Sequence, residues 1–287
     1  MTDRAGGGRR PRRLRTERKR LPPSHELHTL MYHWRMNLDP LSVPGLVRPG
    51  RTPGPVRQAE LAQLVGVSEM YYGALERGER NTRYSDSYLN AVAYALQLSP
   101  DKRNVLYLHA IGEPAPPLPR PPTTAITASM QWFINAQEYP AYYSDQAWDV
   151  ISYNRAMGEW FPHLQYERNI MRWVYHYRQS QYQLVDWESV WAPLMMAQMW
   201  TARAMYPDNQ RLAELIDEAR DDCPLARHQW DHEPLVYEHP DGDRRWLHLP
   251  GRQDPLHVEI MVMTPRRADD LRCVQLLPVA VIEGREP

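Results

Sequence analysis

The sequence predicts two folded units in one chain: an all-α unit of five helices, followed by an α+β unit around an antiparallel sheet. Three observations carry this prediction. The 287 residues exceed the usual size of one domain. Six prolines fall within the ten residues of 113–122. The hydrophobic pattern changes there, from short helical periods to mixed helices and strands. We therefore place an all-α domain at 23–112, a stiff Pro-rich linker at 113–122 and an α+β domain at 123–287.

A charge asymmetry distinguishes the two ends of the chain. The first 24 residues hold nine Lys and Arg against two Asp and Glu, whereas residues 113–287 hold sixteen against twenty-five. Residues 1–22 are rich in Gly, Pro and Arg without apolar periodicity, which predicts a disordered basic arm. A basic N-terminal segment followed by an acidic C-terminal part favours a polyanionic partner for that segment. A solvated tail without a partner is the alternative.

Several classes of protein are disfavoured by what the sequence lacks. No apolar run approaches the ~20 residues of a membrane-spanning helix, and no apolar core follows the basic start as in a secretory signal. Cys223 and Cys273 are too few for a disulfide framework. We therefore expect a cytoplasmic protein with reduced cysteines and no membrane partner.

The first unit begins at Ser24, a good N-cap, followed by the apolar positions Leu27, Leu30, Met31 and Trp34 on one helical face. The Pro- and Gly-rich stretch that follows predicts a long loop. The remaining four helices are expected at 58–65, 68–77, 85–96 and 101–110.

The second unit mixes both kinds of element. Helices are expected at 127–136, 154–160, 168–179, 187–206, 208–220 and 224–232. Strands are expected within 141–153 and at 235–238, 245–249, 257–263 and 272–279. Strands at both ends with helices between them favour an α+β domain.

The most specific motif is RQAELAQLVGVSEMYYGALERG at residues 57–78. Gly66 supplies a turn with positive φ, and Ser68 can cap the helix that follows. This stretch resembles the Cro/repressor-type (XRE) helix-turn-helix family, on the pattern Q-A-E-L-A-Q-x-V-G-V-S followed by L-E-R-G. The resemblance implies a DNA-binding domain whose second helix enters the major groove with its N-terminus first. A packing module that contacts no nucleic acid is the alternative.

The resemblance also assigns roles to residues. Ser68, Glu69, Met70 and Tyr71 lie at the exposed end of the second helix, and the last three are the candidates for contacts with base edges. The candidates for phosphate contacts are Arg57, Gln58, Arg77, Arg80 and Arg83, and a solvated surface charge is the alternative for each arginine. One such motif reads only a half-site, so we expect a homodimer on double-stranded DNA with an inverted-repeat operator.

From residue 25 to about 283, the chain resembles actinobacterial regulators with an MmyB-like ligand-binding domain. The resemblance rests on PAYYSDQAWDVISYNRA at 140–156, ERNIMR at 167–172, Asp186-Trp187-Glu188 and the segment from Pro224 to Trp230. It implies a PAS-like domain that senses a small molecule, and a fatty-acid-type ligand is associated with one branch of that family. The effector is expected to be acyl or aromatic.

The candidates for ligand contact are Asn169, Arg172, Trp173, Trp187, Trp191 and Trp200. Asn169 and Arg172 lie one turn apart on one helical face and could hold a carboxylate, whereas a structural Arg–Asp pair is the alternative. The tryptophans could line an apolar pocket, or they could simply pack in the core.

Catalytic and cofactor signatures are not found in the sequence. There is no G-x-S-x-G elbow, phosphate-binding glycine loop or dinucleotide fingerprint. His228 and His232 are one turn apart but have no fixed third ligand. We therefore expect a regulator that is not an enzyme and has no metal or cofactor. Two alternatives stay open: an enzyme with a DNA-targeting domain, and a DNA-binding regulator whose second domain is a protein-interaction or dimerisation module without a ligand.

Overall fold

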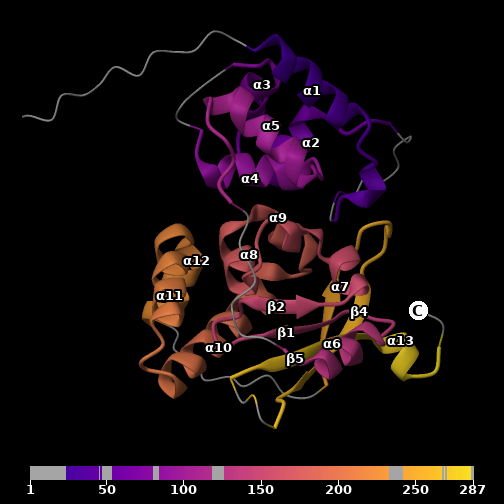
Figure 1. The fold of residues 1–287 in the computed structure, drawn as a ribbon, viewed down its shortest axis with the longest axis vertical. Helices are drawn as coiled ribbons and strands as arrows, with labels where there is room; N and C mark the ends of the chain where they lie inside the picture. The colour runs from indigo at the N-terminus through magenta and orange to yellow at the C-terminus, as the bar shows by residue number, and fades with distance from the viewer. Residues whose placement is uncertain are drawn as a thin grey trace, which may run out of the picture.

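The computed structural model describes residues 24–44, 46, 54–79, 84–117, 126–232, 242–266, 268 and 270–285. Within them the chain forms a helical N-terminal unit and a C-terminal α+β unit (Figure 1). This confirms the predicted order of a helical region followed by an α+β domain with an antiparallel sheet. The predicted basic arm at 1–22 and the predicted strand at 235–238 lie outside the described residues.

The N-terminal unit consists of α1 (His25–Met36), the 3-10 turn η1 (Pro40–Ser42), α2 (Gln58–Val65), α3 (Glu69–Glu76), α4 (Asp86–Ala95) and α5 (Pro100–Ile111). Serine side chains cap four of these helices, as the sequence predicts for α1 and α3. The Ser24 hydroxyl accepts from the backbone N–H of Leu27, and the Ser68 hydroxyl accepts from that of Tyr71. Leu27, Met31 and Trp34 are buried in the core of this unit, as their spacing predicts.

A short turn joins α2 to α3. Gly66 ends α2 with φ of 78°, and its N–H donates to Ala62. This is the left-handed region, which a residue with a Cβ enters only at a cost. The turn at Gly66 therefore sets the direction in which α3 leaves α2.

A buried ion pair fixes α3 against its neighbours. The Arg35 guanidinium donates to both carboxylate oxygens of Glu76, at 2.9 Å and 2.7 Å, and the Gln58 amide donates to the same carboxylate at 3.0 Å. Burial alone would raise the pKa of Glu76, but the hydrogen bonds from Arg35 and Gln58 outweigh it and hold the pKa below its usual value. The network joins α1, α2 and α3.

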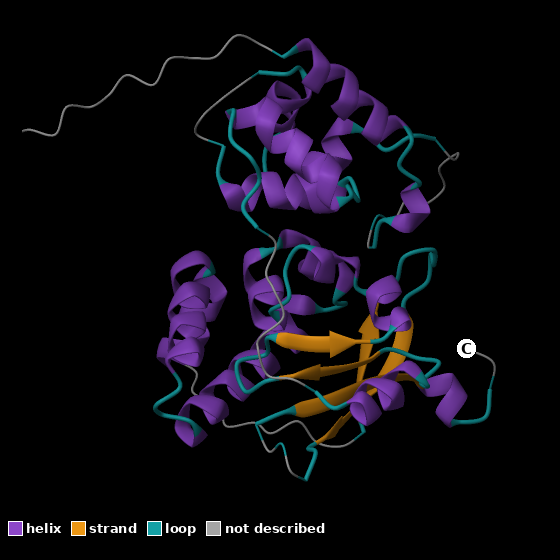
Figure 2. Ribbon diagram, viewed as in Figure 1, coloured by secondary structure: helices purple, strands orange, loops and turns teal. Residues whose placement is uncertain are grey.

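The C-terminal unit is built around one antiparallel sheet in the order β2-β1-β5-β4-β3. The strands are β1 (Ala141–Ser144), β2 (Val150–Tyr153), β3 (Asp243–Leu247), β4 (Leu256–Met263) and β5 (Arg272–Pro278). One face of the sheet packs on the main helical core, and α6 (Ala128–Asn135) covers part of the other face through Ile134 (Figure 2).

The remaining elements of this unit are mostly helical. They are α7 (Arg155–Trp160), the 3-10 turn η2 (Pro162–Gln165), α8 (Ile170–His176), α9 (Arg178–Gln183), the π-turn η3 (Trp187–Trp191), α10 (Ala192–Met205), α11 (Gln210–Asp222), α12 (Pro224–His232) and α13 (Val279–Ile282). The prediction of a single helix at 168–179 is wrong in one respect. The helix is interrupted at Tyr177, whose backbone is extended with ψ of 119°. The Ser180 hydroxyl donates to the carbonyls of Val174 and Tyr177 and stabilises this break.

Because of that break, α9 turns toward the N-terminal unit and packs below α2 and α4 (Figure 1). The Gln179 amide donates to the carbonyl of Ala91 at 3.1 Å, and the Tyr182 hydroxyl donates to that of Gln63 at 3.4 Å. Tyr166, which is buried in the N-terminal core, donates its hydroxyl to the carbonyl of Leu98. The two units therefore share a packed, hydrogen-bonded interface.

The first part of the predicted linker lies against α5. The backbone N–H of Ala115 donates to the Asn104 side chain at 2.9 Å, and Arg103 donates to the carbonyl of Pro116 at 2.9 Å. Residues 118–125 lie outside the described residues.

Candidate functional site

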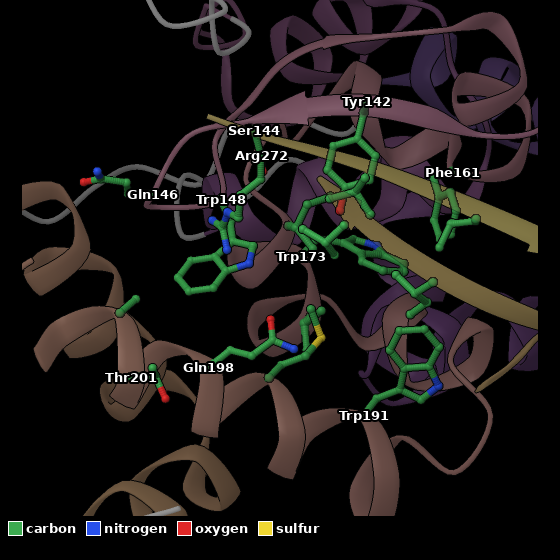
Figure 3. Close-up of a pocket in the computed structure, with 18 of the residues that line it drawn as sticks. Tyr142, Ser144, Gln146, Trp148, Phe161, Trp173, Trp191, Gln198, Thr201 and Arg272 are labelled. Atoms are coloured by element: carbon green, nitrogen blue, oxygen red, sulfur yellow. The ribbon is translucent and has the colours of Figure 1, made fainter. Parts of the chain in front are cut away.

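A cavity of about 360 Å³ lies inside the C-terminal unit, between the sheet and its helices (Figure 3). Its walls are mainly aromatic and aliphatic, with a few polar groups. The aromatic lining residues are Tyr142, Trp148, Phe161, Trp173, Trp191 and Tyr206. A largely apolar cavity of this size with a few polar groups is the usual form of a small-molecule site.

The sheet supplies one wall through alternate residues. Tyr142 and Ser144 on β1 line the cavity, as do Arg272, Val274 and Leu276 on β5. Tyr142 is paired with Val274 and Ser144 with Arg272 in the strand register. Since side chains alternate between the two faces of a strand, these residues share the face that looks into the cavity.

The helices supply the opposite wall. Trp173 and Val174 come from α8, and Trp191 stands at the end of η3. The contribution of α10 is a series at helical spacing, which comprises Met195, Gln198, Thr201, Ala202 and Met205. This spacing places one face of α10 along the cavity.

Two arginines lie in the lining, each against a tryptophan. Arg245 stands 4.6 Å from the centroid of Trp191, and its Nε donates to Asp243 at 2.8 Å. Arg272 stands 4.0 Å from the centroid of Trp148 and donates to the carbonyl of Asp145. Burial lowers the pKa of Arg272 to about 10, which leaves the group protonated at neutral pH.

Of the six residues predicted to contact a ligand, Trp173 and Trp191 line this cavity. Trp187 does not; its Nε1 donates to the carbonyl of Val174 at 3.1 Å. Trp200 also lies outside the lining and stacks on Trp230, with 4.7 Å between ring centroids.

Asn169 and Arg172 have structural partners outside the cavity lining. Asn169 caps α8 by accepting from the N–H of Arg172, and its amide donates to Asp149 at 2.8 Å. Arg172 pairs with Glu167 at 3.0 Å and with Glu218. The alternative of a structural ion pair therefore describes Arg172 better than a ligand contact, although its partners are glutamates.

Sequence reasoning missed Arg272 and Ser144. The available signal was the alternation of side chains along a strand. Arg272 lies two and four residues before Val274 and Leu276, so all three lie on the same face of a largely apolar strand. The alternation of side chains alone does not identify which face of the sheet lines a cavity.

The second region of interest is the exposed N-terminal end of α3. Ser68, Glu69 and Met70 are exposed there, and Met70 has 80% of its surface accessible. Tyr71 packs its ring edge-on against Tyr84 and Tyr88, at 5.6 Å and 4.9 Å between centroids. The turn that precedes this end of α3 lies close to α9, because a Cβ at Gly66 would lie 2.9 Å from Cδ of Arg178.

The predicted phosphate-contacting residues have different surroundings. Arg57 is exposed just before α2, whereas Gln58 is half-buried and bound to Glu76. Arg77 is exposed and pairs with Glu79 at 2.8 Å. Arg80 and Arg83 lie outside the described residues.

His228 and His232 stack on each other with 5.0 Å between centroids. In the part of the chain that the structure describes, no group of three or more His, Cys, Asp or Glu side chains is placed to hold a metal ion. Nor is any helix in that part long and apolar enough to cross a membrane.

The largely apolar cavity with its few polar groups is typical of a small-molecule-binding domain. Residues 126–280, more than half of the chain, match the family described as the MmyB-like transcription regulator ligand binding domain. The chain belongs to this family. A search of curated proteins found no match.

Proposed function

We propose that this protein is a sequence-specific DNA-binding transcription regulator whose operator binding is controlled by a small molecule in the C-terminal cavity. The observation that carries the proposal is the position of α3. Its capped N-terminal end exposes Glu69 and Met70, while α2 of the same unit packs on α9 of a domain that matches the ligand-binding family.

The α2–α3 pair supports a helix-turn-helix of the Cro/repressor type. The turn at Gly66 and the cap at Ser68 are the features that such a motif needs. With α3 in the major groove, Glu69 would accept from a cytosine amino group and Met70 would contact a thymine methyl. Tyr71 is held by its aromatic neighbours and would contact DNA with its exposed edge.

Phosphate contacts would come from the flanks of this motif. Arg57, which is exposed directly before α2, would present its positive charge to one strand. Arg77 would contribute from the end of α3, together with Arg80 and Arg83. We propose that two copies of the chain bind an inverted repeat, because one motif reads only a half-site.

The α8–α9 segment supplies a physical route from ligand to DNA. Trp173 and Val174 on α8 form part of the cavity wall, and α9 follows directly, packs on α2 and is hydrogen-bonded to α4. A ligand that fits one position of α8 better than another would shift the balance between arrangements of the N-terminal units. Such a shift changes the affinity for an operator whose half-sites have a fixed spacing.

We also propose that the protein is not an enzyme. Among the described lining residues, Asp270 is the single carboxylate, and no His or Cys stands with it. A cavity with this lining supports binding rather than general acid–base or nucleophilic chemistry. The cavity likewise favours a ligand-binding domain over an interaction module with a filled core.

The test is a selection of genomic DNA fragments by purified full-length protein at a salt concentration of ~150 mM. We expect an inverted repeat to be enriched. The matched control is the double variant Glu69→Ala/Met70→Ala, which should lose the enrichment and keep weak binding to all fragments. Recovery of random fragments by the unaltered protein, with binding that collapses as salt rises, would show that the proposal is wrong.

A further inference from the structure

An arginine of the C-terminal unit lies over the turn between α2 and α3. It is Arg178, the first residue of α9, and its Cδ stands 2.9 Å from the position that a Cβ would occupy on Gly66. We propose that Arg178 contacts a DNA phosphate beside α3, so that the ligand-binding unit supplies part of the DNA-binding surface. The inference rests on the proposed function of the N-terminal unit as a DNA-binding domain.

The apolar stem of Arg178 covers the turn. Its Cβ and Cγ would lie 3.6 Å and 3.8 Å from a Cβ on Gly66, in addition to the close approach of its Cδ. The guanidinium follows Cδ along the side chain, and the residue is exposed, so its charge lies in solvent beside the turn. Glu69, the first residue of α3, follows Gly66 by three residues, which span at most about 11 Å. The charge therefore lies near the start of α3.

Hydrogen bonds fix α9 against the N-terminal unit. The amide of Gln179, the residue after Arg178, donates to the carbonyl of Ala91 at 3.1 Å. The Tyr182 hydroxyl donates to the carbonyl of Gln63 on α2 at 3.4 Å. The backbone of Arg178 thus has a defined position relative to α2. A cation on an ordered segment loses less entropy on binding than one on a mobile segment.

The charge of Arg178 is not neutralised by a neighbour. Within the described residues, no ion pair or hydrogen bond holds its guanidinium, whereas Arg172 pairs with Glu167 and Glu218. The other residues of α9 are uncharged. This is notable in an acidic unit, because residues 113–287 hold sixteen Lys and Arg against twenty-five Asp and Glu. The acidic unit therefore presents a positive charge where it meets the turn.

DNA bound to α3 would bring phosphates to this charge. A recognition helix enters the major groove with its N-terminus first, and a row of phosphates runs along each edge of the groove. Groups that flank the N-terminal end of α3 therefore face phosphates. Arg57 precedes α2 and Arg178 lies at its opposite end, so the two arginines would reach different phosphates. The planar guanidinium suits a phosphate, to which it can donate two charge-assisted hydrogen bonds.

The same contact would connect bound DNA with the cavity. Trp173 and Val174 on α8 line the cavity, and Arg178 follows Val174 by four residues, across the break at Tyr177. A ligand that displaces α8 would therefore move the Arg178 side chain relative to the phosphate. The affinity for DNA would change even without a change in the spacing of the half-sites.

The test compares the salt dependence of DNA binding among full-length variants, on an operator duplex and on a random duplex. Arg178→Met removes the charge and keeps an unbranched apolar stem over the turn. It should weaken binding to both duplexes about fivefold at ~150 mM salt, as the loss of one phosphate contact predicts. It should also lower the slope of log affinity against log salt by about one unit. Arg178→Lys retains the charge and should keep most of the slope.

Two controls and one double variant accompany these proteins. Arg285→Met removes an exposed arginine next to α13, which lies far from α3 (Figure 1), and should leave the slope unchanged. Arg57→Ala should lower the slope by about one unit, and the Arg57→Ala/Arg178→Met double variant by about two, since separate contacts add. A stem that only packs on the turn would affect urea unfolding of Arg178→Met and leave the slope unchanged.

The inference is wrong if Arg178→Met keeps the slope of the unaltered protein, and an enriched inverted repeat would in that case leave the proposed function standing. Because a phosphate contact carries no sequence information, the random duplex tests it separately. A lower slope for Arg178→Met without an enriched repeat would refute the proposed function and leave this inference standing. The absence of any salt-dependent binding to DNA would refute both.

Discussion

The indole of Trp173 lies parallel to the imidazole of His163, with 4.0 Å between ring centroids and 7° between planes. Trp173 forms part of the cavity wall, and His163 is 1% exposed behind it. On its other side, His163 meets the ring edge of Tyr94 on α4 at 6.4 Å. Three stacked or touching rings thus connect the ligand cavity with the core of the N-terminal unit.

A first prediction concerns the pH dependence of stability. Burial holds the pKa of His163 well below 6.5, so the folded protein keeps the ring neutral where the unfolded chain takes up a proton. The stability that this provides is present above pH 6.5 and is lost as pH falls toward the folded-state pKa. Relative to His163→Leu, the natural protein should lose about 1 kcal/mol of unfolding free energy between about pH 7.5 and about pH 5.5.

Urea unfolding of both proteins at several pH values measures this difference. Burial also lowers the pKa of His248, so this residue makes the unfolding free energy depend on pH in the same direction. Its contribution is the same in both proteins and cancels in the comparison. Parallel curves for the two proteins would contradict a neutral, buried His163.

A second prediction concerns the buried ion pair of the N-terminal unit. Glu76→Ala leaves the Arg35 charge buried without its carboxylate and should cost about 3–5 kcal/mol of stability. Glu79→Ala is the matched control, because Glu79 pairs with Arg77 at 2.8 Å with both side chains more than half exposed. Its cost should stay below about 1 kcal/mol. Equal losses in thermal or urea unfolding would mean that the Arg35–Glu76 network does not fix α3.

Some features of this fold depend only on residues that are close together in the sequence, and helix caps are the main example. Ser24, Ser68 and Asn169 all cap helices, and capping depends on one side chain and the next three residues. Sequence alone does not distinguish an Asn that caps a helix, as Asn169 does, from an Asn that binds a ligand. For Arg172 the sequence left a ligand contact and a structural ion pair open; Glu218, one of its two glutamate partners, is brought to it only by the packing of α8 on α11.

Other features depend on contacts between distant parts of the chain. No proline or glycine marks the break between α8 and α9 in the sequence. The break allows α9 to pack on α2 and to bond to α4. Arg272 joins the cavity through the register between β5 and β1, which lie far apart in sequence. Neither feature follows from local periodicity.

A third prediction tests the turn between α2 and α3. Gly66 and Gly251 both have positive φ, at 78° and 79°, so alanine should cost about 1–2 kcal/mol at either position. A Cβ at Gly66 would also lie 2.9 Å from Cδ of Arg178, whereas at Gly251 it would meet nothing within 4 Å. Gly66→Ala should therefore be the more destabilising change.

The excess cost is attributed to Arg178, and a double variant checks this. In an Arg178→Ala background, Gly66→Ala should cost about as much as Gly251→Ala does in the natural protein. If the excess persists without the Arg178 side chain, the contact between α9 and the α2–α3 turn is not its cause.

A fourth prediction separates reading of bases from contact with phosphates on the proposed operator. Glu69→Ala and Met70→Ala should each reduce the discrimination between operator and random DNA by about 1–3 kcal/mol, because each removes a base-edge contact. Both side chains are exposed, so the folded structure should be unaffected. Arg57→Ala should instead weaken binding to both DNAs alike and lower the slope of log affinity against log salt by about one unit. If Glu69→Ala and Met70→Ala weakened both DNAs equally, α3 would not be the helix that reads the bases.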